Sequence, residues 1–330
     1  MADQPQVVPW LQTRWSHLCG LHRSQRLPHA LIVHGAKGLG KGEFATAFAH
    51  YLLCHSPQGD QPCGHCRACE LNAAGGHPDL YQLAPEDTGK PIKVDQIRVL
   101  TDFINSTAQQ GGYRVVVINP ADAMNIAAAN ALLKMLEEPG QDTVLMLLTD
   151  RIGQVMPTIK SRCQRVECAL PDAETAKQFV MAELKVDAEE AGNLLAVTNG
   201  APVAAIDYSQ SGLADQRSQL IKGLADVLKQ RRSVVDVAQS WQKMDLELAL
   251  GWFYSMLVDV ARAKSTGTET VQHADARNML LAVTRKVNAK ALFELAEVVQ
   301  EERKSLILRQ NTNKQMLLER ILLGWLAIVK

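Results

Sequence analysis

Four of the seven cysteines lie close together and could hold a metal ion. They are spaced C-x8-C-x2-C-x2-C and are Cys54, Cys63, Cys66 and Cys69. Overlapping C-x2-C steps let neighbouring thiolates meet on one tetrahedral ion, and four sulfurs leave no position for water. The spacing therefore predicts a closed, structural zinc site. The alternatives are a redox-active C-x2-C pair or inert surface thiols, and the nearby His55 or His65 could replace one cysteine.

A glycine-rich segment before the cysteines could bind phosphate. The apolar run 30–34 leads into Gly35-Ala36-Lys37-Gly38-Leu39-Gly40-Lys41-Gly42, and a helical stretch follows. Strand, glycine turn and helix are the context of a P-loop, in which backbone N–H groups surround the phosphates and the lysine reaches the outer ones. The residue after Lys41 should carry a hydroxyl that holds Mg²⁺, but it is Gly42. The segment is thus a degenerate nucleotide site, or only a tight turn that binds no nucleotide.

A second apolar strand, residues 114–118, ends without the acids that an active P-loop ATPase places there. Those carboxylates normally bind the metal and orient the attacking water. Here the strand is followed by Asn119 and Pro120. Asp122 comes slightly later, where we expect it to start a helix rather than replace the missing acids. The hydroxyl and the acids are absent together, which favours a nucleotide-type fold that has lost hydrolysis.

Two motifs further along the chain resemble the clamp-loader branch of the AAA+ ATPases. They are the helix Asn130-Ala131-Leu132-Leu133-Lys134-Met135-Leu136-Glu137-Glu138-Pro139 and the later Ser161-Arg162-Cys163. The resemblance covers residues 1–210 well and the remainder more loosely. It implies ATP bound between neighbouring subunits of a ring, with Arg162 reaching as an arginine finger into the next subunit's site. A guanidinium suits that role because it neutralises charge on the transferred phosphoryl group. Outside the motif, Arg162 would be a solvated loop arginine.

The same resemblance bears on nucleotide sensing and on partners. Thr149 matches the family's sensor position at a strand end, where it would contact the γ-phosphate or water, and its alternative role is to cap the strand. Binding of ATP or ADP by this chain stays open. The implied partners are ATP-hydrolysing sister subunits and a delta-type subunit in a hetero-pentameric ring. The sliding clamp and primer–template DNA would be reached through the assembly.

The elements that must position these residues suggest three domains. Residues 1–166 alternate strands and helices and imply an α/β P-loop (AAA+) domain with a parallel sheet, into which a four-cysteine zinc module is inserted at 54–69. Its strands are expected near 31–34, 80–83, 114–118 and 144–149. Residues 167–208 are expected to form a small helical lid. Residues 209–330 repeat apolar residues at helical spacing and are expected to form an all-α collar that oligomerises.

Composition excludes several classes of protein. The chain has 330 residues, with 35 Lys+Arg against 35 Asp+Glu, so it has no chain-wide basic field with which to wrap nucleic acid. The N-terminal residues lack the basic and apolar regions of a secretory signal. No apolar stretch approaches the ~20 residues of a membrane-spanning helix. We therefore expect a cytoplasmic protein without a membrane partner.

The resemblance implies a non-hydrolysing subunit of the replicative clamp loader of DNA polymerase III. It would brace the ring and donate Arg162 in trans, so that the sliding clamp is loaded on primed DNA. No ATP hydrolysis is expected from the isolated chain, which would be an accessory subunit of a DNA-directed DNA polymerase, a nucleotidyltransferase. The alternatives are an active P-loop ATPase of the motor type, and a zinc-containing DNA-binding or repair module with a vestigial P-loop.

Overall fold

The chain folds into two compact units in a computed structural model. The structure describes residues 6–87, 89–267, 271–307 and 313–329. Residues 1–175 form the first unit and residues 176–330 the second. The first combines strands with helices, whereas the described part of the second is helical. Each unit is described below by itself.

A five-stranded parallel sheet forms the centre of the first unit. Its order is β2-β3-β4-β1-β5. The strands are β1 (Ala30–His34), β2 (Leu80–Leu83), β3 (Arg114–Ile118), β4 (Thr143–Thr149) and β5 (Gln164–Glu167). Every residue of β3 and β4 is buried, as expected for interior strands of a parallel sheet with helices on both faces. The predicted parallel sheet is confirmed.

The strand β5 was not predicted from the sequence. It lies at the edge of the sheet beside β1, and among its four residues only Val166 is buried. An edge strand that exposes most of its side chains lacks the continuous apolar run of the interior strands. The sequence therefore contains little signal for it, and pairing with β1 reveals it.

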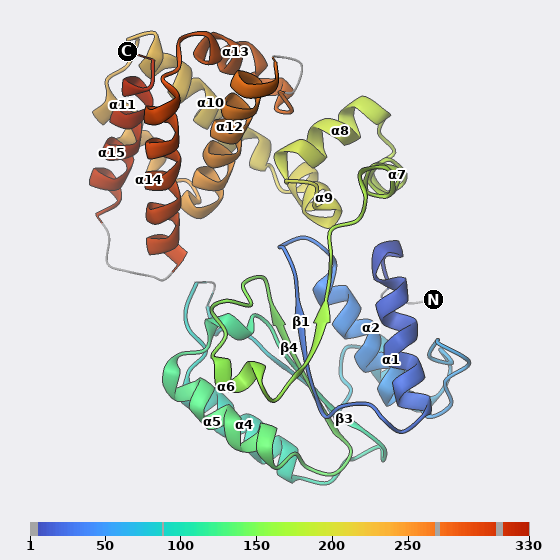
Figure 1. The fold of residues 1–330 in the computed structure, drawn as a ribbon. Helices are drawn as coiled ribbons and strands as arrows, with labels where there is room; N and C mark the ends of the chain where they lie inside the picture. The colour runs from blue at the N-terminus through green and yellow to red at the C-terminus, as the bar shows by residue number, and fades with distance from the viewer. Residues whose placement is uncertain (1–5, 88, 268–270, 308–312, 330) are drawn as a thin grey trace. The chain divides into compact units, whose positions relative to one another are not determined.

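Helices cover both faces of this sheet. Figure 1 shows α1 and α2 on one side and α4 and α5 on the other. The helices of this unit are α1 (Gln12–Arg23), α2 (Lys41–Leu53), α3 (Arg67–Ala73), α4 (Val94–Asn105), α5 (Ile126–Glu137) and α6 (Pro157–Lys160), with 3-10 turns at Pro9–Leu11 and Ala121–Ala123. The helix α7 (Ala173–Leu184) begins in this unit and continues into the second. The four clustered cysteines follow the helix of the glycine segment, as expected: three lie between α2 and α3, and Cys69 lies in α3.

The second unit is helical in the part that the structure describes, as predicted. It consists of most of α7, then α8 (Ala188–Val197), α9 (Pro202–Gln210), α10 (Leu213–Leu228), α11 (Val234–Trp241), α12 (Leu246–Thr266), a 3-10 turn (Ala274–Ala276), α13 (Arg277–Lys286), α14 (Ala289–Ile307) and α15 (Lys314–Ala327). A small apolar core joins α7, α8 and α9. A larger one is centred on α10 to α15. None of the described helices combines the length and the apolar character needed to cross a bilayer.

Candidate functional site

The glycine segment connects β1 to α2, as the sequence predicted, and follows the carboxyl end of a central strand. Gly35 lies where the backbone passes close to the end of β5. A Cβ added to Gly35 would lie 2.2 Å from the carbonyl oxygen of Cys168. The backbone N–H of Cys168 donates a hydrogen bond to His34 O at 2.7 Å. Gly40 precedes α2 with a left-handed φ of 82°, which favours glycine. These positions need glycine for the shape of the turn itself.

The lysine of the segment is bound inside the protein. Lys41 is only 7% exposed, and its Nζ donates to Gly35 O at 3.1 Å and to Ala36 O at 2.6 Å. The same Nζ forms an ion pair with Asp150 Oδ1 at 2.6 Å. All three N–H bonds of an ammonium group therefore have an acceptor. A phosphate on this loop would have to compete with Asp150 for the lysine.

The predicted sensor residue is also paired inside the protein. Thr149 ends β4, is fully buried, and donates from Oγ1 to Asp122 Oδ1 at 2.6 Å. Its Oγ1 accepts the N–H of Arg151 at 2.9 Å. Asp122 lies in the short 3-10 turn Ala121–Ala123, which follows β3. The hydroxyl thus links the end of β4 to the turn after β3.

Arg162 lies in the turn between α6 and β5. Its Nη1 donates to Thr158 O at 3.0 Å, and its Nη2 forms an ion pair with Glu137 Oε1 at 2.7 Å. The side chain is about one-third exposed, and the Glu137 side chain is more exposed. These contacts are to α5 and α6, and none is to the glycine segment of the same chain. Arg162 is therefore a surface cation held by one acid.

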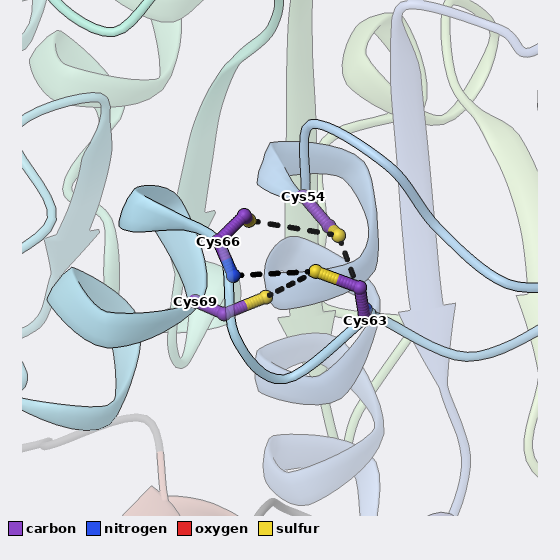
Figure 2. Close-up of side chains that lie close together, drawn as sticks. All are labelled: Cys54, Cys63, Cys66 and Cys69. Carbon is purple, nitrogen blue, oxygen red and sulfur yellow. Dashed lines mark hydrogen bonds between the residues drawn. The ribbon is translucent and has the colours of Figure 1, made fainter.

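The four predicted metal ligands converge. Their Sγ atoms all lie within 4.8 Å of one another, and Figure 2 shows the four side chains gathered in one place. Cys54 follows the end of α2, Cys66 precedes α3, and Cys69 lies in the first turns of α3. The distance is 3.9 Å between the Sγ atoms of Cys54 and Cys66, and also between those of Cys63 and Cys69. The residue types and the distances suit a tetrahedral thiolate site.

Backbone N–H groups point at two of the sulfurs. The N–H of Cys63 donates to Cys54 Sγ at 3.2 Å, and that of Cys66 donates to Cys63 Sγ at 3.4 Å. A backbone hydrogen bond from His65 lowers the pKa of the Cys63 thiol to about 5. Burial raises the pKa of the Cys54 and Cys69 thiols. The Cys63 thiolate is thus favoured without a metal, whereas the thiolates of Cys54 and Cys69 need a cation to stabilise them.

The segment between α2 and Cys63 is held against α1. The indole N–H of Trp15 donates to Asp60 O at 3.0 Å. Arg23 forms an ion pair with the Asp60 carboxylate and donates to Gly59 O at 3.2 Å. These bonds fix the loop that carries Cys63 relative to the helices of the first unit.

Sequence reasoning missed the partners of the two predicted basic residues. Asp150 directly follows β4, and Lys41 follows the glycine segment after β1. Because the carboxyl ends of neighbouring parallel strands meet at one edge of the sheet, the sequence could have indicated this contact. Glu137 stands in the quoted helix motif without an assigned role, and no local signal pairs it with Arg162.

Comparisons with known proteins agree with this architecture. The family model described as DNA polymerase III, delta subunit, matches residues 11–171, and that of its C-terminal part matches residues 211–327. The chain is therefore a subunit of the DNA polymerase III type. It is 38% identical to DNA polymerase III subunit delta' of Pseudomonas aeruginosa over 99% of both chains. It is also 32% identical to the protein of that name from Yersinia pestis and 30% identical to that from Escherichia coli. Each of these two alignments covers 96% of this chain and 94% of the relative. The chain belongs to the DNA polymerase III subunit delta' family.

Proposed function

We propose that this chain is a non-hydrolysing subunit of a clamp-loader ring of the AAA+ type, and that it donates Arg162 in trans. Family membership supports a role in the DNA polymerase III holoenzyme. In this role the chain works beside ATP-hydrolysing sister subunits and a delta-type subunit. Residues 1–166 are the degenerate P-loop domain, residues 167–208 are a lid, and residues 209–330 form the collar that joins the ring.

The observation that carries the proposal is the contrast between the glycine segment and Arg162. Gly42 offers no hydroxyl for Mg²⁺, and Asn119 and Pro120 follow β3 in place of acids. Lys41 and Thr149 are engaged by acids of the same chain. The parts that hydrolysis needs are thus missing or occupied, whereas the arginine that serves a neighbouring site is present at the surface.

Arg162 can leave its resting contact at little cost. Both members of the Arg162–Glu137 ion pair are solvent-accessible, and an exposed pair contributes about 0–1 kcal/mol. The negative charge of a neighbour's γ-phosphate, with its several oxygens, is a stronger partner for a guanidinium than one exposed carboxylate. Glu137 therefore acts as a holding site for the arginine until a neighbour presents ATP.

We also propose that the four cysteines hold a structural zinc ion. A tetrahedron with Zn–S bonds of about 2.3 Å has sulfurs about 3.8 Å apart, close to the 3.9 Å of two pairs here. Cys54, Cys63, Cys66 and Cys69 would fill every coordination position, so the ion would fix the loop between α2 and α3 and would perform no catalysis. The donor set thus supports structural zinc.

The test is reconstitution of the clamp-loader assembly with Arg162→Ala in this subunit. Loss of an arginine finger lowers turnover at the site it serves by about 10³-fold or more, and Arg162→Lys is expected not to restore it because lysine lacks the bidentate fork. The matched control is Arg26→Ala, an exposed arginine near the end of α1. DNA-stimulated ATPase of the assembly that is unchanged by Arg162→Ala, or rapid ATP turnover by the isolated chain, would contradict the proposal.

A further inference from the structure

The ammonium group of Lys41 has a single N–H bond that a bound anion could take over. The other two donate to carbonyls of the glycine segment itself, Gly35 O at 3.1 Å and Ala36 O at 2.6 Å. The third acceptor is Asp150 Oδ1 at 2.6 Å, on a side chain that is 37% exposed. The carbonyls belong to the backbone of the turn, whereas a partly exposed side chain can rotate away. A phosphate oxygen therefore reaches the lysine only where the Asp150 carboxylate now lies.

The sheet places Asp150 beside the glycine segment. Thr149, the last residue of β4, pairs in register with His34, the last residue of β1. Figure 1 shows these two strands side by side. Gly35 and Asp150 come next in the chain, so both leave the sheet at the same edge. The backbone N–H of Arg151 donates to Thr149 Oγ1 at 2.9 Å and holds the turn that carries the carboxylate.

The rest of the glycine segment is already shaped as an anion site. Gly38 and Gly40 have left-handed φ angles of 79° and 82°. The indole N–H of Trp10 donates to the carbonyl of the buried Leu39 at 3.0 Å, which fixes the turn from outside. Within the part of the chain that the structure describes, no side chain caps the N-terminus of α2. The positive end of a helix attracts an anion, and Asp150 is the anion that this chain supplies beside it.

We propose that Asp150 is an internal ligand that occupies the phosphate position of the glycine segment and so excludes nucleotide from it. Its carboxylate has the sign of charge of a phosphate and uses the same N–H of Lys41. A nucleoside diphosphate or triphosphate has to displace the carboxylate and then lies close to its negative charge. Nucleotide exclusion is thus assigned to Asp150, whereas Gly42 and the residues after β3 account for the loss of hydrolysis.

This inference rests on the proposed function in one respect, the assignment of the glycine segment as a degenerate P-loop. It does not use Arg162 or the other subunits of the ring. ADP binding is measured on the isolated full chain, whereas the arginine is tested by the ATPase activity of the assembly. Either proposal can therefore fail while the other stands.

The test is Asp150→Asn, which removes the charge and keeps the shape of the side chain. The asparagine Oδ1 can still accept the N–H of Lys41, so the fold should be retained, and thermal melting followed by circular dichroism checks this. The matched control is Asp142→Asn, which removes an exposed carboxylate just before the opposite end of β4, outside the described ion pairs. Binding of ADP is measured by titration calorimetry without magnesium, since Gly42 offers no hydroxyl for the ion.

The expected result is that Asp150→Asn binds ADP at least about tenfold more tightly than the unmodified chain, because a like charge is removed from beside the phosphates. Asp142→Asn should leave the affinity unchanged. The double variant Asp150→Asn, Lys41→Met should lose the gain, since the lysine supplies the positive charge. Equal ADP affinities of Asp150→Asn and Asp142→Asn, including no binding by either, would overturn the proposal. A gain in affinity that survives the loss of Lys41 would also overturn it.

Discussion

Asp275→Ala is expected to destabilise the second unit strongly, because it leaves a buried cation without its anion. Arg217 on α10 is 1% exposed, and it makes a bidentate ion pair with Asp275. The distances are 2.6 Å from Nε to Oδ2 and 2.9 Å from Nη2 to Oδ1. Its Nη1 is buried with no hydrogen-bond partner among the described residues. The guanidinium also lies 5.6 Å from the ring centre of Trp252, which compensates only part of a lost carboxylate.

The magnitude follows from the unequal burial of the two partners. Removal of one member of a fully buried ion pair costs about 3–5 kcal/mol. The Asp275 side chain is 44% exposed, so water can enter its place and solvate part of the guanidinium. We therefore expect a loss of about 2–3 kcal/mol in the free energy of unfolding of this unit. Equilibrium urea unfolding, followed by circular dichroism, measures it.

Two further variants separate the charge effect from a general loss of contacts. Glu297→Ala on α14 removes an exposed acid with no described partner and should change the free energy of unfolding by less than about 0.5 kcal/mol. The double variant Arg217→Met, Asp275→Ala should be no less stable than Asp275→Ala alone, since no charge stays buried. If Asp275→Ala behaves like Glu297→Ala, the cation is solvated and the reasoning is wrong.

Two more predictions concern the cysteine cluster and a buried histidine. Purified chain should contain one zinc ion by elemental analysis, and the Cys66→Ser variant should lose it. The Cys163→Ala variant, which changes a buried cysteine outside the cluster, should keep the ion. Equal zinc contents of these two variants would disprove the assignment. Burial first, and the nearby Arg217, lower the pKa of His273, whose folded pKa therefore lies below the usual ~6.5. The nearby charges of Asp259 and Asp275 raise the pKa of His273 but do not offset the lowering. The stability gained by burying the neutral imidazole is thus complete above pH ~6.5 and is lost as the pH falls through the folded pKa. Urea unfolding between pH 7 and 5 should show a smaller pH dependence for His273→Gln, and an unchanged slope would contradict this.

The site residues differ in how they could be found. The cysteine cluster was predictable because its ligands lie within one short segment, where spacing alone limits the geometry. The missing hydroxyl at Gly42 and the missing acids after β3 are facts of covalent sequence that folding does not change. The interior strands were predictable because burial on both faces requires continuous apolar runs. The edge strand β5 has no such requirement and was missed, whereas the other edge strand, β2, was predicted.

What the sequence determined by itself is local: a thiolate cluster, a glycine turn without a magnesium ligand, and apolar runs with the period of strands or helices. Only the tertiary structure decided which charges these parts meet. Lys41 reaches Asp150 because β1 and β4 are neighbours in the sheet, and Arg162 reaches Glu137 because α6 contacts α5. Between α1 and β5, a small cavity of about 100 Å³ likewise joins residues that are far apart in the chain. Such pairings depend on strand order and helix packing, which are set by the burial of the whole core and not by any single segment.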